Sequence, residues 1–398
     1  MSVPGASAVL VRHGDIGVKS SRVQAAMERR LGESIEAMLA DRGVPGTTER
    51  EPGRLVVRTE EPDAATEAVT DVFGVLSASP TRTVAPTLDA IADALAEIAP
   101  AVFDGGTFAV DARRTGDQAF TSQDVGRVGG DAVWHAVGDD HDPAVDLDDP
   151  DHRFFVEVRD DEAYVFLDKR DGPGGFPLGS QSPLVALVSG GIDSPVAAWR
   201  AMRRGSPVVP LYLDLGDYGG PDHRARALSV VETVASYAPD RDMRPRVVEV
   251  GEYLDRLVEA TANTRMLSYR RFMYRIAEHV AESEGAAGIV TGEAIGQKSS
   301  QTVGNLNAVD RATTMPIHRP LLTWDKQEII ASARRIGTYR DATIDTGCNR
   351  VAPSNPATRA SVEAVERNEP DDLFEWAGEA AATVDVVESP TLTAEGSS

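Results

Sequence analysis

Residues 184–195 read LVALVSGGIDSP, and this stretch decides the fold of the second half of the chain. Its first five residues are all apolar and predict a buried strand. The strand runs into a Ser-Gly-Gly turn, and a helix is expected to begin at Ser194 with Pro195 at its first position. Backbone N–H groups of such a turn and helix start form a concave anion site. The stretch therefore predicts a phosphate-binding unit, with an ordinary capped turn as the structural alternative.

The residue types inside the turn fit that chemistry. Gly190 and Gly191 have no Cβ and let the backbone come close to a phosphate. Ser189 and Ser194 supply hydroxyl donors. Asp193 repels phosphate, so we expect it to act through Mg²⁺ or to pair with a lysine.

Downstream of the turn, short apolar segments alternate with helical ones. This alternation predicts an α/β domain with a doubly wound parallel sheet. By the rule that ligands bind where the strand order reverses, Tyr212 and Leu213 at the end of the second strand would flank an adenine ring. The candidate strands are residues 184–188, 208–213, 246–250, 288–291 and 317–322.

Two smaller α+β patterns come before a Gly/Pro-rich linker at residues 172–179. The first pattern is typical of a ferredoxin-like unit, with a helix over 22–39 and a strand over 54–58. The second has helices at 87–98 and 121–137, a strand at 107–114 and a hairpin of 154–158 with 163–167. We therefore expect domains at 1–75, 76–171 and 180–383, and a disordered tail at 384–398.

The charge of the chain is strongly negative. Its 398 residues carry 63 acidic and 40 basic side chains, a formal net charge of −23. Taken alone, this charge argues against a nucleic-acid partner and favours a protein adapted to salt, as in halophiles. No apolar run approaches the ~20 residues of a membrane span, and the N-terminus lacks a secretory pattern, so we expect a cytoplasmic protein.

Cysteine and lysine are scarce. The single cysteine, Cys348, excludes an internal disulfide, a zinc site built on Cys pairs and a Cys-ligated cluster within one chain. Composition alone makes it a small buried hydrophobe, whereas the neighbouring Arg350 would favour a reactive thiolate. The seven histidines show no metal-ligand spacing, so no zinc is expected. Only four lysines occur, Lys19, Lys169, Lys298 and Lys326.

The turn sequence SGGIDS matches the signature of the PP-loop ATP pyrophosphatases, whose domain is adenine nucleotide alpha hydrolase-like. Further segments resemble one family of that class, the tRNA 4-thiouridine synthases, including its THUMP RNA-binding domain and its ferredoxin-like N-terminal domain. These segments follow the family order over nearly the whole chain: 13–19, 113–122, 166–170, 172–179, 291–302, 319–322 and 325–330. All four lysines fall inside them.

The resemblance implies an ATP- and Mg²⁺-dependent enzyme that converts uridine 8 of tRNA to 4-thiouridine through an adenylated uridine and a persulfide on Cys348. It implies catalytic roles for Asp193, Lys326 and Cys348, whereas Lys298 receives no role. Arg270 is the nucleotide ligand by resemblance, although a surface pair with Arg271 is the structural alternative. The expected nucleotide set is Leu187, Val188, Ser189, Gly190, Gly191, Asp193, Ser194, Tyr212, Leu213, Arg270, Gly292 and Gln301, and the expected RNA set is Arg113, Arg114, Lys169 and Arg170.

Several alternatives stay open at this stage. Another PP-loop activity such as 2-thiolation usually needs further Cys pairs, and a non-catalytic THUMP RNA-binding protein has no need of an intact turn, Lys326 and Cys348. A second role in thiazole (thiamine) sulfur supply and a homodimer are also compatible with the resemblance. Longer family members carry a rhodanese domain with a second cysteine, which this sequence lacks. The sulfur donor, a cysteine desulfurase or sulfide, is therefore undecided.

Overall fold

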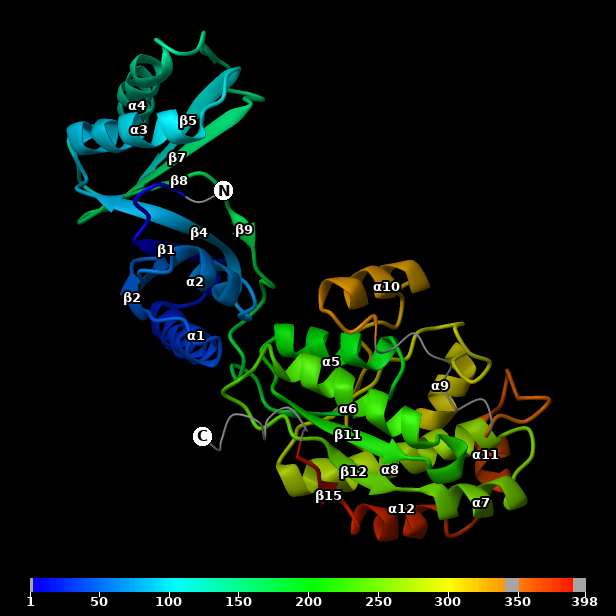
Figure 1. Ribbon diagram of the computed structural model, residues 1–398. Coiled ribbons are helices and arrows are strands. Elements are labelled where there is room, and N and C mark those ends of the chain that lie inside the picture. The colour runs from blue at the N-terminus through cyan, green and yellow to red at the C-terminus, as the bar shows by residue number, and fades with distance from the viewer. Residues whose placement is uncertain (1–2, 341–350, 389–398) are drawn as a thin grey trace. The chain divides into compact units, whose positions relative to one another are not determined.

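The computed structural model describes residues 3–340 and 351–388. The chain divides into two units, residues 1–177 and 178–398, which are described separately (Figure 1). Cys348 lies outside the described residues. Within them, no helix combines the length and the apolar character needed to cross a membrane.

The first unit is built on a nine-stranded sheet in the order β2-β3-β1-β4-β8-β7-β5-β6, with β9 paired to β4. Most neighbouring strands are antiparallel, but β5 runs parallel to both β6 and β7. The predicted hairpin is confirmed by the antiparallel pairing of β7 with β8. The strands are β1 (Ala8–His13), β2 (Thr47–Glu51), β3 (Arg54–Arg58), β4 (Val75–Val84), β5 (Thr107–Arg114), β6 (Ala144–Val145), β7 (His152–Val158), β8 (Ala163–Phe166) and β9 (Arg170–Asp171).

Four α-helices pack on this sheet, and α1, α3 and α4 each begin within one residue of their predicted starts. Helix α4 has a complete capping box, in which Thr121 and Asp124 each bind the other's backbone N–H. The helices are α1 (Ser21–Asp41), α2 (Pro62–Val69), α3 (Leu88–Val102) and α4 (Ser122–Val137), preceded by the short 3-10 helix η1 (Asp15–Val18).

Strand β4 was not anticipated from the sequence. Two of its buried residues are Ser79 and Thr81, whose hydroxyls donate to the carbonyls of Asp168 (2.6 Å) and Val165 (3.0 Å). These satisfied polar residues hide the apolar alternation that would mark a strand. The strand pairs with β1 over its first part and with β8 over its last three residues, so it crosses the boundary predicted at residue 75. The division into 1–75 and 76–171 stays a prediction.

The second unit contains the predicted doubly wound sheet, in the order β14-β13-β10-β11-β12-β15. The first five strands are parallel, and β15 is antiparallel to β12. The chain leaves β10 toward β11 and later returns to its other side as β13, so the order reverses beside β10. The strands are β10 (Leu184–Val188), β11 (Val208–Asp214), β12 (Arg246–Glu249), β13 (Ile289–Val290), β14 (Ile317–His318) and β15 (Asp385–Val386).

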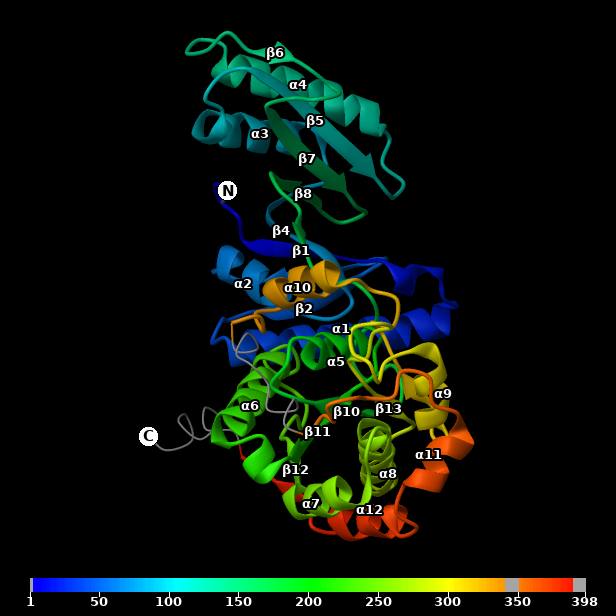
Figure 2. The same cartoon turned by 90° about the vertical axis from the view of Figure 1, so that its right-hand side faces the viewer.

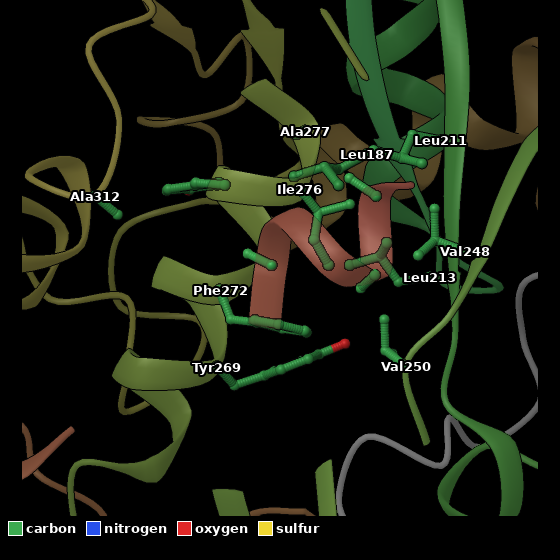
Figure 3. Close-up of a cluster of buried hydrophobic side chains, with 14 of the residues drawn as sticks. Leu187, Leu211, Leu213, Val248, Val250, Tyr269, Phe272, Ile276, Ala277 and Ala312 are labelled. Atoms are coloured by element: carbon green, nitrogen blue, oxygen red, sulfur yellow. The ribbon is translucent and has the colours of Figure 1, made fainter. Parts of the chain in front are cut away.

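Helices cover both faces of this sheet. Helices α5 and α6 pack on one face and α8 and α12 on the other (Figures 1 and 2). Figure 3 shows the hydrophobic core between the sheet and α8, in which Leu187, Leu211 and Val248 of the sheet meet Phe272 and Ile276 of α8. The helices are α5 (Asp193–Arg203), α6 (Pro221–Ala235), α7 (Gly251–Ala260), α8 (Arg265–Glu284), α9 (Val303–Asp310), α10 (Lys326–Arg335), α11 (Val362–Asn368) and α12 (Leu373–Ala381), with η2 (Gly216–Tyr218) after β11.

The last predicted strand and the C-terminal tail differ from the sequence expectations. The strand expected over 317–322 stops at His318, because Pro320 cannot donate to a ladder and Arg319 turns toward the buried carboxylate of Glu293. The tail expected to be disordered from 384 instead supplies β15. There the Val387 N–H donates to the Pro245 carbonyl (3.1 Å), and Glu388 pairs with Arg244 (2.9 Å). The disorder prediction is therefore wrong for residues 385–386.

Candidate functional site

A cavity of about 300 Å³ lies at the carboxyl ends of β10, β11 and β13, where the strand order reverses. It is closed on one side by α8. Most of the residues predicted from the sequence to bind a nucleotide come together in its wall: Leu187, Val188, Ser189, Gly191, Asp193, Ser194, Tyr212, Leu213, Arg270, Gly292 and Gln301.

A second hollow of about 560 Å³ opens at the ends of β11 and β12. Its wall includes Asp214, Glu249, Glu252 and Asp385, with Arg224 as the basic member. This excess of carboxylates repels phosphate. The cavity beside β10 is therefore the candidate nucleotide site, although it is the smaller of the two.

The Ser-Gly-Gly turn is closed by its own hydroxyl groups. The Ser189 N–H donates to Ser194 Oγ (2.9 Å), and the Gly191 N–H lies 3.3 Å from Ser189 Oγ. Helix α5 begins at Asp193, one residue earlier than predicted, and no side chain caps its start. The uncapped N–H groups of its first turn are therefore available to an anion at the cavity edge.

Two glycines let chain segments approach the turn. A Cβ on Gly292 would lie 2.7 Å from the Ser194 nitrogen, so only glycine fits where the chain leaves β13. Gly190 does not line the cavity. A Cβ there would lie 3.1 Å from Arg226 Cβ and 3.3 Å from the His223 carbonyl oxygen, so Gly190 makes room for α6 rather than for a ligand.

Lys326 reaches the turn from the start of α10. Its Nζ lies 2.6 Å from Asp193 Oδ1, and both side chains are partly exposed. A capping box of Asp325 and Glu328 fixes the start of the helix and hence the origin of the lysine side chain. The structure thus provides the lysine partner that the sequence analysis expected for Asp193.

Arg270 is held by a buried carboxylate that the sequence analysis did not single out. Glu293 pairs with Arg270 and with Arg319 Nε (2.7 Å), and it accepts a hydrogen bond from Tyr274 OH (2.6 Å). Burial alone would raise the pKa of Glu293, but the two guanidinium groups hold that pKa below its ordinary value. In its hydrogen-bonded orientation the Gln301 amide accepts from Arg270 Nη2 (3.1 Å).

Arg271 points away from the cavity and is not a surface residue. Its side chain is 2 % exposed and pairs with Glu369 (2.8 Å from Nε to Oε2), and its Nη1 donates to the Ala308 carbonyl (2.8 Å). The surface arginine pair considered in the sequence analysis is therefore wrong for this residue. Consecutive residues on a helix point in different directions, so the side chains of Arg270 and Arg271 lie on different sides of α8.

Tyr212 is buried, and its hydroxyl group lies 2.8 Å from His223 Nδ1 of α6. His223 is buried as well and lines the cavity. Burial, followed by the positive charge of Arg226, lowers the pKa of His223 and favours the neutral ring.

Sequence reasoning missed part of the cavity wall. Met266, Tyr269 and Met273 lie at the three- and four-residue spacing that places them on the helix face of Arg270, so this spacing could have revealed them. Five of the others, between residues 291 and 300, belong to the recognised segment 291–302 but were given no nucleotide role. The rest lie outside the recognised segments. The wall residues absent from the predicted set are Leu215, His223, Met266, Tyr269, Met273, Tyr274, Thr291, Glu293, Lys298, Ser299, Ser300 and Ala352.

The four residues predicted to bind RNA lie in the first unit and differ in their surroundings. Lys169 is exposed, with Nζ 4.0 Å from the centre of the Phe155 ring. Partial burial, then the positive charges of Arg12 and Arg113, lowers the pKa of Lys169. Arg113 is exposed as well.

The other two predicted RNA ligands are engaged within the protein. Arg170 pairs with Asp63 (2.8 Å) and Asp168 (3.2 Å). Arg114 donates to the carbonyl groups of Gly116 and Gln118. Lys169 and Arg113 are therefore better placed than these two arginines to meet an external anion.

No group of three or more His, Cys, Asp or Glu side chains among the described residues is arranged to hold a metal ion. The cavity wall holds two carboxylates, and Glu293 is already engaged by Arg270 and Arg319, so Asp193 at the turn is the better placed to hold a metal ion. Mg²⁺ in nucleotide sites usually takes one or two carboxylates and completes its shell with phosphates and waters. Asp193 beside a phosphate-sized turn fits that requirement.

Three family models match the chain. They are described as Thiamine biosynthesis protein (ThiI) over residues 179–373, THUMP domain over 85–168 and ThiI ferredoxin-like domain over 8–79. A probable tRNA sulfurtransferase of Halobacterium salinarum is 66 % identical over 388 residues, covering 98 % of this chain and 99 % of that protein. A probable tRNA sulfurtransferase of Methanosarcina acetivorans is 39 % identical over 362 residues, covering 90 % and 87 %.

Comparison with solved structures agrees with these sequence matches. A crystal structure of a 4-thiouridine synthetase–RNA complex with bound ATP superposes with a TM-score of 0.84 at 28 % identity, covering 96 % of this chain and all of that one. A Pyrococcus horikoshii protein superposes with a TM-score of 0.66 at 22 % identity, covering 83 % and 99 %. At that identity the second match concerns the fold alone.

Proposed function

The chain belongs to the tRNA sulfurtransferase family, and from this premise we propose that it transfers sulfur to tRNA in an ATP-dependent reaction. The product would be 4-thiouridine at position 8. The observation that carries the proposal is the Ser-Gly-Gly turn at the cavity edge, with Lys326 Nζ 2.6 Å from Asp193. This arrangement joins an anion-binding turn, a carboxylate and a cation at the switch point of the sheet.

In the proposed complex, ATP lies across the carboxyl end of β10. The N–H groups of the turn and of the first turn of α5 would hold phosphate oxygens, together with the hydroxyl groups of Ser189 and Ser194. Adenine would lie against the backbone of Tyr212 and Leu213 and the apolar side chains that α8 contributes to the wall. Arg270 would contact the nucleotide, and Glu293 holds the Arg270 side chain in position.

Mg²⁺, when bound with ATP, would neutralise phosphate charge and so make the α-phosphorus easier to attack. Asp193 is the residue that would hold it. Lys326 would keep Asp193 oriented and would lie at the pyrophosphate end, where negative charge grows as the leaving group departs.

The proposed chemistry has two steps. The uridine O4 attacks the α-phosphorus and releases pyrophosphate, which gives an adenylated uridine. Sulfur, carried as a persulfide on Cys348, then displaces AMP from the activated carbon. Ala352, four residues after Cys348 in the sequence, lines the cavity. A cysteine desulfurase would load Cys348 by passing its own persulfide sulfur to the thiolate. Because the sequence holds no second cysteine, external thiols would supply the two electrons that release the thiolated product and regenerate Cys348. With sulfide as the donor, HS⁻ would instead displace AMP directly, and no persulfide would form on Cys348.

RNA binding is assigned to the first unit, in the predicted ferredoxin-like and THUMP domains. Arg113 and Lys169 are the proposed contacts, since both are exposed. Arg114 and Arg170 would contribute by shaping this surface through their bonds within the unit.

The test is mass spectrometry of tRNA nucleosides from a strain that lacks the gene and is complemented with variants. We expect 4-thiouridine to disappear in the deletion strain, to return with the wild type and to remain absent with Cys348→Ala. Lys326→Ala should lower turnover by about 10²–10³. Normal 4-thiouridine in the deletion strain would refute the proposed function, whereas a normal level with Cys348→Ala would refute the role of the cysteine alone.

A second role, sulfur supply to a thiamine precursor, is proposed because the matching family model is described as a thiamine biosynthesis protein. The same deletion strain tests it. Growth that requires added thiamine, restored by the wild-type gene, is the expected result; growth without thiamine contradicts this role and leaves the tRNA reaction untouched.

A further inference from the structure

A cluster of arginines lies where α5 and α10 pack together. We name it the α5–α10 arginine surface and define it by Arg200, Arg203, Arg334 and Arg335. The guanidinium carbon of Arg200 lies 4.0 Å from the centre of the Trp324 ring, and that of Arg335 lies 5.3 Å from the Trp199 ring. Arg334 and Arg335 are exposed. The indole rings hold two of the guanidinium planes in fixed positions.

Three of these arginines, Arg200, Arg334 and Arg335, form no ion pair with a carboxylate of the described residues. Glu328 acts on Arg200 through its charge, but its carboxylate accepts the Asp325 N–H at 2.9 Å. By contrast, Arg244 and Arg246, just before and at the start of β12, each contact acidic side chains.

The like charges in this surface interact with one another. Burial, then the positive charges of Arg203 and Arg335, lowers the pKa of Arg200. Such repulsion is unfavourable in the free protein and is relieved by a bound polyanion. The chain as a whole has a net charge of −23, so this group of arginines is a local positive region on an acidic protein.

The surface lies toward the C-terminal ends of the two helices that begin at the candidate nucleotide site. Helices α5 and α10 start together, where Lys326 meets Asp193, and they are still in contact where Arg335 covers Trp199. At 1.5 Å per residue, Arg203 lies about 15 Å along α5 from Asp193. An RNA strand whose base enters the cavity can span this distance with the adjoining stretch of its backbone.

We propose that the α5–α10 arginine surface binds the sugar-phosphate backbone of the RNA whose base enters the cavity. The planar guanidinium fork matches two phosphate oxygens at once, and arginine is the preferred residue for such recognition. This inference rests on the proposed function, because it takes RNA as the substrate of the adjoining cavity. It adds a backbone contact in the second unit to the RNA contacts proposed for the first.

The experiment measures tRNA affinity of the full-length protein as a function of KCl concentration. The double variant Arg334→Gln/Arg335→Gln removes two exposed charges, and Arg334→Lys/Arg335→Lys retains them. Arg256→Gln is the matched control, because Arg256 is also exposed and lies over two aromatic rings, Tyr253 and Trp376, but on α7. ATP affinity is measured in parallel by calorimetry, without turnover.

We expect the Gln double variant to lose about tenfold in tRNA affinity and to reduce the salt slope by about two. The Lys variant should recover most of the loss, and ATP affinity should not change. Wild-type tRNA affinity and salt slope in the Gln variant would overturn the proposal, as would an equal loss in Arg256→Gln. Unchanged tRNA affinity with slower sulfur transfer from a desulfurase would overturn it too, and would assign the surface to a protein partner. A wild type that binds ATP but not tRNA would instead defeat the proposed function.

Discussion

At Gly292 the chain passes so close to the start of α5 that no side chain fits. A Cβ there would lie 2.7 Å from backbone atoms of Asp193 and Ser194, which cannot move without opening the turn. Gly292→Ala is therefore expected to cost about 1–3 kcal/mol of stability and to weaken ATP binding. Denaturant unfolding and calorimetry measure the two effects.

Gly304→Ala is the control for that substitution. Gly304 lies in α9, and a Cβ added there would meet no atom of the described residues within 4 Å. Alanine should therefore be neutral at this position or stabilise the helix slightly through its higher helix propensity. Equal behaviour of the two alanine variants would show that the close approach at Gly292 has no consequence for the turn.

His223 makes the stability of the protein depend on pH. Its pKa is lowered below the ordinary value of 6.5, by burial first and then by Arg226, while Asp214 of β11 opposes the shift. The unfolded chain therefore binds a proton at a higher pH than the folded chain. The contribution of His223 is fully present above about pH 6.5 and is lost as the pH falls below that value.

We expect His223→Gln to be less sensitive to acid than the wild type. The comparison is the midpoint of urea unfolding between pH 5 and pH 8. His13, whose pKa is also lowered by burial, acts in the same direction in both proteins, so the difference between them isolates His223. Parallel pH profiles for the two proteins would contradict the assignment.

At the residue scale, the sequence located the motif residues but not their partners. Ser189, Asp193 and Ser194 could be found because they are adjacent in the sequence. Glu293 could not, since its partners Arg270 and Arg319 lie 23 and 26 residues away and no local pattern joins them. The lysine partner of Asp193 was anticipated because Lys326 lies in the segment 325–330 that resembles a family motif.

At the element scale, Arg271 connects three helices. From α8 it pairs with Glu369, directly after α11, and it donates to the Ala308 carbonyl of α9. Burial raises the pKa of Glu369, and Arg271 opposes that effect. Removing the arginine leaves a half-buried carboxylate without its main partner.

Arg271→Met should therefore destabilise the second unit by about 3–5 kcal/mol. Arg367→Met, an exposed position on α11, should change stability by less than about 0.5 kcal/mol. Thermal unfolding of the two variants gives the comparison. Similar losses in both would mean that the buried ion pair contributes little.

The accuracy of the predicted strands depended on how clear the apolar pattern was. Strand β10 and strand β5 have the predicted bounds, because apolar runs and alternation were clear there. Strand β4 was missed because hydroxyl side chains replace apolar ones at buried positions. The two-residue strands β13 and β14 are shorter than predicted, since Gly292 and Pro320 end the regular pairing.

At the scale of the whole molecule, the net charge of −23 governs the response to salt. Unlike charges already form many ion pairs, so the excess acidic groups mainly repel one another. Raising KCl from 0.1 M to 1 M shortens the screening length from about 10 Å to about 3 Å. The midpoint of thermal unfolding should therefore rise with KCl over this range. A midpoint that stays level or falls would show that attractive pairs outweigh the repulsion.

The same net charge misleads when it is used to exclude partners. An average over the chain hides local groups such as the α5–α10 arginine surface and the exposed pair Arg113 and Lys169. The family was identified from motif order, which is a property of the whole sequence. Neither composition nor periodicity could have placed these basic groups on the surface.

Strand β4 also bears on how such proteins can be reshuffled during evolution. Its first part belongs to the ladder with β1 and its last three residues to the ladder with β8. A recombination crossover near residue 75 would separate β4 from β1 or from β8. One of the resulting proteins would then have a sheet edge with unpaired backbone groups, which is prone to aggregation. The first 177 residues should therefore be inherited together, whereas the Gly/Pro-rich stretch that ends them offers a site where unrelated genes can be joined.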